Sequence, residues 1–204
     1  DAHNILVIGA DILSRISDPH DRDSMIYADG AGATLLTSQK STTPTGILAH
    51  KTRSDTLEHS EMLFMGDSYL PENGTKEGVY LKMYGRKLYQ YALNHVPGAI
   101  RACLHKSGIP LSEIKKVLIH QANGKMDDAI LNRLYKLEDD LSVPVDVMPM
   151  TISWLGNSSV ATVPTLLDLI LKNELDGHQI EKGDKIIFAS VGAGMNINAM
   201  VYQA

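Results

Sequence analysis

Cysteine is nearly absent from this sequence, which has one, Cys103, among 204 residues. A single thiol cannot form an internal disulfide, so no disulfide framework holds the fold, and the composition fits a reducing compartment. The longest apolar stretches, such as VATVPTLLDLILKN, end before the roughly 20 residues that a membrane-spanning helix requires. The N-terminus shows no basic segment followed by an apolar one, the pattern of a secretory signal. We therefore expect a cytoplasmic protein with no membrane partner.

An excess of basic charge is missing too. The chain has 19 Lys and Arg against 24 Asp and Glu, which gives a formal net charge of -5. This balance argues against a general nucleic-acid binder, although a local basic patch could still receive an anionic partner. With 44% apolar and 21% charged residues, the composition is that of a globular chain with one sizeable core or two small ones.

The periodicity of the apolar residues predicts an α/β chain in which strands and helices alternate. We expect strands at residues 5–10, 33–38, 79–83, 115–120, 144–150, 185–190 and 195–202, and helices at 84–108, 125–137 and 159–173. Residues 40–78 read as rich in loops. Pro97 predicts a kink in the first helix, and Gly108 its end.

The helical segment 158–171 is apolar nearly all the way round, which predicts packing on several sides. We expect one sheet to leave part of it uncovered, so that the chain self-associates through this helix or exposes a large apolar patch. The end of the sequence, KIIFASVGAGMNINAMVY, echoes its beginning: a strand, a turn of small residues and another strand. The echo indicates a duplicated unit whose first copy is represented by its last strands alone.

His120 in LIHQANGKM and Asn157 in WLGNSSVATVP are the candidate functional residues. Each has a structural alternative, because His120 could be a hydrogen-bonded residue at a strand end and Asn157 a helix N-cap. VGAG does not match a dinucleotide loop, since it lacks the third glycine and precedes a strand, so we expect a tight hairpin turn. Cys103 lies on the apolar stripe of its helix and is expected to be inert packing. In favour of chemistry, His120 and Asn157 both follow predicted strands, whose ends converge on one edge of a sheet.

Four motifs in order give the sequence a close resemblance to the β-ketoacyl-acyl carrier protein synthase III family. They are LKMYGRKLYQYA, HQAN, GNSSVATVP and the terminal VGAG hairpin, and GADILSRISDPHDRDSMIYADGAGATLL resembles the end of the family's first half. The resemblance covers essentially the whole chain. It implies a thiolase-like fold of five layers, α-β-α-β-α, with residues 1–40 ending the N-terminal half and residues 41–204 forming the C-terminal half.

The resemblance implies a condensing acyltransferase that joins an acyl-CoA starter to malonyl-acyl carrier protein with loss of CO₂. His120 and Asn157 match the two neutral donors that stabilise the oxyanion formed on decarboxylation, and Ala193 matches the residue whose backbone N–H serves a second oxyanion. The family usually has Gly at the place of Ala193. No metal or resident cofactor is implied, since the coenzyme A thioester is a substrate. The substrate-binding positions carried over are Arg22, Met83, Gly85, Tyr89, Ala122, Asn123, Lys125 and Met126.

Two departures from the family pattern qualify the resemblance. Lys125 stands where Arg is common, so the charge is kept but the bidentate fork is lost. A basic rim for an acidic carrier protein is expected from Lys82, Arg86, Lys87, Lys125 and Arg133.

The family's nucleophilic cysteine has no counterpart, and Cys103 does not fit its context. The sequence is therefore interpreted as the C-terminal part of a homodimeric synthase, inactive alone. A subunit of a heteromeric synthase and a non-catalytic module for acyl-CoA or carrier protein remain alternatives.

Overall fold

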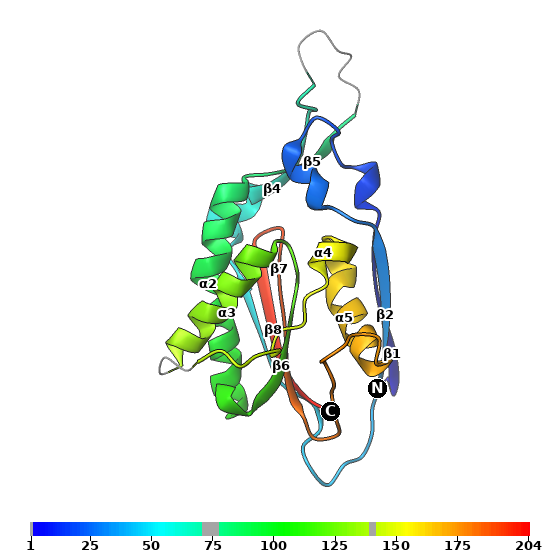
Figure 1. The fold of residues 1–204 in the computed structure, drawn as a ribbon, viewed down its shortest axis with the longest axis vertical. Coiled ribbons are helices and arrows are strands. Elements are labelled where there is room, and N and C mark those ends of the chain that lie inside the picture. Colours follow the sequence, from blue (N-terminus) through cyan, green and yellow to red (C-terminus); the bar gives the residue numbers. More distant parts are fainter. Residues whose placement is uncertain (1, 71–77, 139–141) are drawn as a thin grey trace.

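The computed structural model describes residues 2–70, 78–138 and 142–204. Figure 1 shows successive layers: a pair of long helices, a four-stranded sheet, a single helix and a two-stranded sheet. In chain order the elements are β1 (Asn4–Asp11), β2 (Gly30–Thr37), β3 (Gly46–Ser54), α1 (Thr56–His59), β4 (Leu63–Gly66), β5 (Tyr80–Met83), α2 (Gly85–Ser107), β6 (Ile114–Ile119), α3 (Gly124–Leu137), α4 (Ile152–Leu155), α5 (Thr162–Leu171), β7 (Lys185–Gly192) and β8 (Asn196–Gln203). Within the described ranges, no helix is both long enough and apolar enough to span a bilayer.

The four-stranded sheet has the order β3-β8-β7-β6, with β6 and β7 parallel and the other pairs antiparallel. Helices α2 and α3 cover one face, where the main core gathers around residues such as Ile100, Ile130 and Ile187. Helix α5 covers the other face with Leu166 and Ile170, which pack against residues of β6 and β7. The sheet is thus buried on both faces, as strands joined through helical crossovers require.

Helix ends follow the expected signals. Helix α2 continues through Pro97 and ends at Gly108, whose φ of 71° places it in the left-handed conformation that glycine adopts easily. Helix α3 begins after Asn123, whose side-chain oxygen accepts hydrogen bonds from the backbone N–H groups of Lys125 and Met126 at 3.1 and 3.3 Å.

Strands β1 and β2 form a two-stranded sheet that packs on α5 through glycines, and β4 and β5 form a second, shorter pair. In the antiparallel pair of β1 and β2, Gly9 lies opposite Gly32. A Cβ built on Gly32 would lie 2.5 Å from Cγ of Pro164, and one on Gly30 2.9 Å from Cβ of Ala161. Because no side chain fits at these positions, the glycines of DGAGA serve the close approach of a helix rather than a phosphate or a turn.

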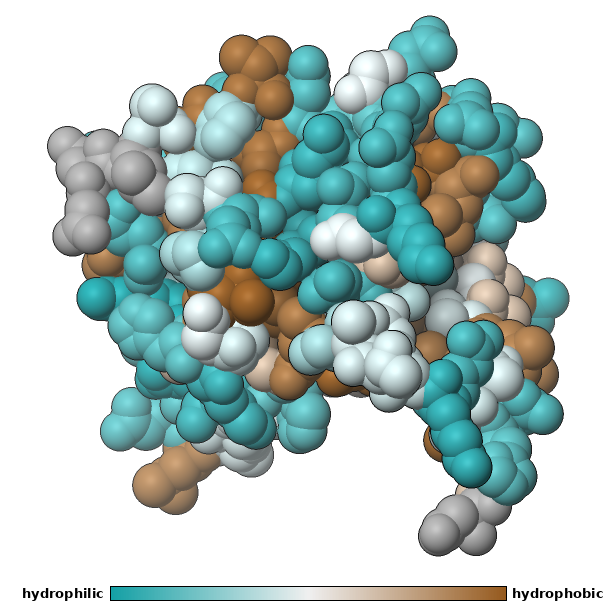
Figure 2. All heavy atoms as spheres, turned by 90° about the horizontal axis from the view of Figure 1, so that it is seen from below, coloured by the Kyte–Doolittle hydropathy of each residue, from teal (hydrophilic) through white to brown (hydrophobic). Residues whose placement is uncertain are grey.

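The prediction that helix 158–171 lacks cover for its second side is wrong, because β1 and β2 of the same chain supply it. Exposed apolar residues lie on the outer face of that two-stranded sheet, where Leu6, Ile8 and Leu35 are 60, 65 and 64% exposed. In the helical segment itself, Val160 and Leu171 are 55 and 60% exposed. Figure 2 shows hydrophobic atoms at the right-hand edge of the molecule, the side on which Figure 1 places β1 and β2.

Two of the predicted elements differ from the structure. The region 40–78 contains β3 and β4, which the sequence pattern missed because β3 is an edge strand with Ala49 as its one buried residue. The strand predicted at 144–150 is wrong. Val147 and Met148 are buried there in an irregular segment, and the Val147 carbonyl accepts one hydrogen bond, from the backbone of Val117 at 2.8 Å.

Candidate active site

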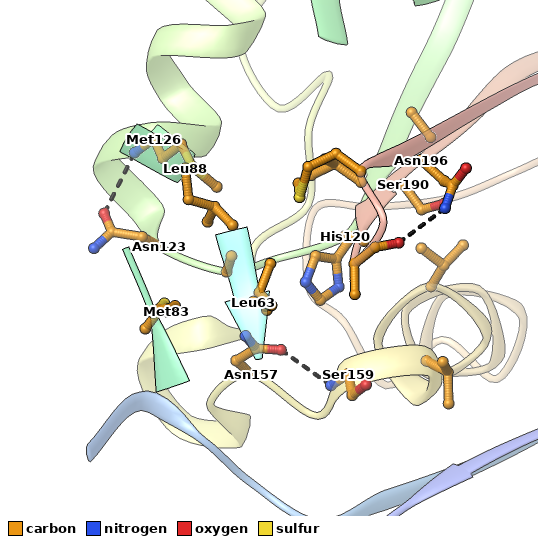
Figure 3. Close-up of a pocket in the computed structure, with 18 of the residues that line it drawn as sticks. Leu63, Met83, Leu88, His120, Asn123, Met126, Asn157, Ser159, Ser190 and Asn196 are labelled. Carbon is orange, nitrogen blue, oxygen red and sulfur yellow. Dashed lines mark hydrogen bonds between the residues drawn. The ribbon is translucent and has the colours of Figure 1, made fainter. Parts of the chain in front are cut away.

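A cavity of about 1160 Å³ opens where β6 and β7 end, between the four-stranded sheet and the segment from Asp11 to Tyr27. Figure 3 shows His120 and Asn157 pointing into it from two different segments of the chain. Of the eleven site residues predicted from the sequence, ten line this cavity: Arg22, Met83, Gly85, Tyr89, His120, Ala122, Asn123, Met126, Asn157 and Ala193. Lys125 does not line it, and its side chain is exposed on the first turn of α3.

His120 directly follows β6, and its backbone N–H donates to the carbonyl of Ala189 in β7 at 2.9 Å. The strand pairing therefore continues up to the catalytic candidate and holds its backbone firmly. Burial lowers the pKa of the imidazole, and a hydrogen bond with the backbone of Ser159 acts in the opposite direction. The net lowering keeps His120 neutral at neutral pH, so the ring has one N–H donor and one acceptor nitrogen and carries no charge.

Asn157 is held by the early part of the chain. Its backbone N–H donates to the carbonyl of Ile26 at 2.8 Å, and its carbonyl accepts from the N–H of Ala28 at 2.9 Å. Gly156 makes this approach feasible, because a Cβ there would lie 3.1 Å from both the Ala28 side chain and the Ile26 carbonyl. Asn157 is thus fixed by residues more than a hundred positions away in the sequence.

The side chain of Asn157 combines the two roles that the sequence left open. Its Oδ1 accepts a hydrogen bond from the N–H of Ser159 at 3.0 Å, as a cap does (Figure 3). This bond fixes the orientation of the amide, so that Nδ2 is the free donor and has no hydrogen-bond partner among the described residues. The backbone of Ser159 also acts on the imidazole of His120, so one segment of the chain lies beside both side chains.

Ala193 lies in the turn between β7 and β8, and the turn lines the cavity. The carbonyl of Ala193 accepts a hydrogen bond from the side-chain nitrogen of Asn196 at 2.8 Å (Figure 3). Met195, two residues further along the turn, is buried, and its carbonyl accepts a hydrogen bond from the N–H of Asp55 at 2.9 Å. Both ends of the turn are therefore anchored.

Lys82 does not belong to the exposed basic rim that the sequence predicted, so that prediction is wrong for this residue. It is 1% exposed, with its Nζ 2.5 Å from Oδ2 of Asp18, 3.3 Å from Asp21 and 3.6 Å from the centre of the Tyr69 ring. Burial by itself raises the pKa of Asp18, but Lys82 and hydrogen bonds from His20, Ser68 and Tyr69 bring it well below its usual range. A buried charge is stable only when paired in this way, so Lys82 is unavailable to a partner.

Polar residues that the sequence reading missed lie on the sheet face toward the cavity. They include Thr52, Ser190, Asn196 and Asn198, all of which line it. Thr52 donates from its hydroxyl to Oδ1 of Asn198 at 2.9 Å. The available signal was alternation: Asn196 and Asn198 are separated by the buried Ile197, so they share one face of β8.

Cys103 does not contribute to the cavity. The thiol lies within α2, is 1% exposed and donates to the carbonyl of Ala199 at 3.4 Å. Burial raises the pKa of this thiol, which disfavours the nucleophilic thiolate. The prediction that this cysteine is buried packing is confirmed.

Two sheets with a helix between them, and a cavity at the strand ends, define a thiolase-fold protein, and known proteins agree. The model for the 3-oxoacyl-[acyl-carrier-protein] synthase III C-terminal region matches residues 104–204, and the model for 3-oxoacyl-[acyl-carrier-protein] synthase III matches residues 1–56. The chain belongs to the β-ketoacyl-acyl-carrier-protein synthase III family.

Individual relatives show how much of the family architecture this chain spans. The β-ketoacyl-[acyl-carrier-protein] synthases III of Acaryochloris marina and Trichodesmium erythraeum are 33 and 32% identical, and each alignment covers 98% of this chain but 58 or 59% of the relative. The crystal structures of the enzymes from Aquifex aeolicus and Thermus thermophilus superpose with TM-scores of 0.78 and 0.82 at 29 and 26% identity. They are matched over 99 and 100% of this chain and 58 and 60% of their own.

Proposed function

We propose that this chain supplies the decarboxylation half of a condensing acyltransferase active site, and that the parent reaction joins an acyl-CoA starter to malonyl-acyl carrier protein. The observation that supports it most directly is the pairing of a neutral His120 with the free amide nitrogen of Asn157 in one cavity. Two neutral donors that are already oriented stabilise a developing oxyanion better than water, which must reorganise.

In the proposed step, the bond between the malonyl α-carbon and the carboxylate breaks and CO₂ leaves. The electron pair passes into the thioester as an enolate, whose oxygen accepts hydrogen bonds from His120 and Asn157. The enolate carbon then attacks the acyl thioester, and the backbone N–H of Ala193 is proposed to stabilise the oxyanion formed there. Collapse of this oxyanion breaks the C–S bond and releases the thiolate that carried the acyl group. Of these steps, only the decarboxylation can proceed with residues of this chain alone.

The other predicted residues have binding roles in this proposal. Arg22, Met83, Gly85, Tyr89, Ala122, Asn123 and Met126 line the cavity for the coenzyme A nucleotide and pantetheine arm. The exposed Arg86, Lys87, Lys125 and Arg133 form the reduced basic rim for the carrier protein. The proposal includes a cytoplasmic location, a homodimeric full-length enzyme, an N-terminal half that ends near residue 40, and an isolated chain that cannot complete condensation.

A module that binds acyl-CoA or carrier protein without catalysis, alone or as a subunit of a heteromeric synthase, is the second candidate. It is favoured by Cys103, the single cysteine of the sequence, because that thiol is buried away from the cavity. Without a thiol in the cavity, no acyl-cysteine intermediate can form on the residues that line it.

Release of CO₂ from malonyl-CoA and malonyl-acyl carrier protein distinguishes the two candidates. We expect this chain to release CO₂ above the rate without protein, and His120→Ala and Asn157→Ala to lower that rate on the order of 100-fold each. Asn132→Ala is the control, since Asn132 is exposed on α3 and its amide bonds the carbonyl of Asp128. Thioester binding without CO₂ release, or equal rates in all variants, contradicts the decarboxylation proposal.

Mass spectrometry after incubation with acetyl-CoA tests the missing nucleophile. We expect no acetyl adduct on Cys103, because its thiol is buried and its pKa is raised. A stoichiometric adduct there would instead identify a complete transferase within this chain.

A further inference from the structure

A partly buried hydrogen-bond cluster lies outside the residues that line the cavity. Oδ2 of Asp55 accepts from the hydroxyl of Tyr91 at 2.7 Å and from Nε of Arg53 at 2.7 Å. Tyr91 projects from α2 and is 3% exposed. Its ring packs edge-on against His59, with centroids 5.1 Å apart, and at a tilt against His95 at 4.6 Å.

Asp55 joins this cluster to the turn that carries Ala193. The backbone N–H of Asp55 donates to the carbonyl of Met195 at 2.9 Å. Asp55 directly follows β3, whose last residue, Ser54, is paired with Asn196 at the start of β8. The same residue therefore holds α2 through its carboxylate and the cavity turn through its backbone.

We propose that Tyr91, acting through Asp55, is a positioning residue for the turn 193–196. The inference rests on the proposed function for the catalytic use of the turn, whereas the positioning itself does not depend on it. Tyr91 touches no substrate, since neither it nor Asp55 lines the cavity. Its hydroxyl fixes where the Asp55 carboxylate lies, and the Asp55 backbone fixes where Met195 lies.

The bond from Tyr91 is the decisive one of the two that reach Asp55. The side chain of Arg53 is 43% exposed, so water and salt weaken its ion pair. Tyr91 is 3% exposed and its bond to Asp55 is partly buried, so water competes with this bond less than with the one from Arg53. Arg53 and then Tyr91 lower the pKa of Asp55, so the acceptor stays charged and the bond is of the stronger, charge-assisted kind.

Tyr91→Phe, followed by amide hydrogen exchange resolved by NMR, tests this inference on the chain without any ligand. The variant keeps the ring packing against His59 and His95 and removes only the hydroxyl. We expect exchange of the Asp55 amide, which donates to the Met195 carbonyl, and of the Asn196 amide to accelerate about tenfold, while amides in β6 are unchanged. Asp55→Asn keeps the shape but removes the charge, and is expected to give a smaller acceleration at the same amides.

Tyr135→Phe is the matched control. Tyr135 is also 3% exposed, but its hydroxyl has no hydrogen-bond partner among the described residues, so its removal should leave the turn unchanged. Unaltered exchange in Tyr91→Phe, or an acceleration equal in β6 and in the turn, overturns the positioning role. Because the measurement involves no thioester, failure of the decarboxylation proposal would leave this result intact, and the reverse also holds.

Discussion

The four-stranded and two-stranded sheets are built from similarly apolar strands but are buried to very different extents. In the larger sheet Ile186 and Val201 have no exposed surface, because α2, α3 and α5 cover its faces. In β1, Leu6 and Ile8 are more than half exposed, although α5 covers the opposite face of the same strands. A strand that is apolar on both faces is typical of a sheet buried on both faces.

The difference shows that β1 and β2 carry a surface suited to further packing. Leu6 lies directly opposite Leu35 in the register, and Ile8, two residues further along β1, lies on the same face. The described residues place nothing over these side chains. The relatives are longer than this chain, which spans about 58% of the Acaryochloris marina enzyme. The four-stranded sheet is therefore a core covered on both faces, here called the completed core, whereas the sheet of β1 and β2 is covered on one face. The variants below compare the two.

Ile187→Ala in the completed core has the largest expected effect. Ile187 is 1% exposed in β7, so truncation leaves a cavity and should lower the free energy of unfolding by about 4 kcal/mol. Ile8→Ala is the matched truncation in β1 and should cost less than about 1 kcal/mol, since its side chain is largely exposed already. Urea unfolding followed by circular dichroism measures both. Equal losses would mean that the two sheets are buried alike.

Asp127 is a polar defect inside the completed core. It is fully buried in α3, and neither carboxylate oxygen has a hydrogen-bond partner among the described residues. Burial, with a contribution from Asp128, raises its pKa from 3.8 to about 8.

Because the folded chain then holds this proton more tightly than the unfolded chain, the stabilising contribution is complete below pH 3.8 and is lost as the pH rises to about 8. From pH 6 to pH 8 the unaltered chain should lose about 2 kcal/mol that Asp127→Asn does not lose. Urea titrations at the two pH values test this, with Asp176→Asn as control, because Asp176 is exposed and does not contribute to the pKa of Asp127. A parallel pH dependence in the unaltered chain and Asp127→Asn would show that Asp127 is ionised in the folded state.

Gly32→Ala tests the junction between the two regions. The added methyl would meet Pro164 of α5 at 2.5 Å, so β2 must move away from the helix at a cost of about 2 kcal/mol. Gly98→Ala in α2 is the control, because no atom lies within 4 Å of its added Cβ and helix propensity favours alanine. Thermal unfolding should give opposite shifts for the two variants. A neutral Gly32→Ala would mean that β2 is not held closely against α5.

The double variant Leu6→Gln and Ile8→Gln has the smallest expected effect on stability, below about 0.5 kcal/mol. It should nevertheless reduce binding of a hydrophobic dye and any self-association seen by analytical ultracentrifugation, because it interrupts the apolar outer face. Leu57→Gln is the control, since Leu57 is 97% exposed and lies apart from this face in α1. An unaltered chain that is monomeric at high concentration and binds no dye would show that the outer face needs no cover.

Most elements were predictable from the sequence because their apolar periodicity is strong. Helices α2, α3 and α5 and strands β6, β7 and β8 all lie within the predicted segments or within two residues of them, and Gly108 ends α2 as expected. Strand β3 was missed because an edge strand with one buried residue carries little pattern. The strand predicted at 144–150 was wrong because a buried residue in an irregular stretch, here Val147, gives the same apolar signal as a strand.

The sequence by itself determined the alternation of elements and the family, and it indicated His120 and Asn157 as candidate donors, because short motifs and periodicity are local properties. Only the tertiary structure decided which polar groups are free to act. Asn157 is oriented by Ser159 and by the distant Ile26 and Ala28, and Lys82 is withdrawn into a pair with Asp18. Such outcomes depend on burial and on contacts between remote segments, which set the pKa of a group and the direction of a hydrogen bond and leave no mark in local sequence.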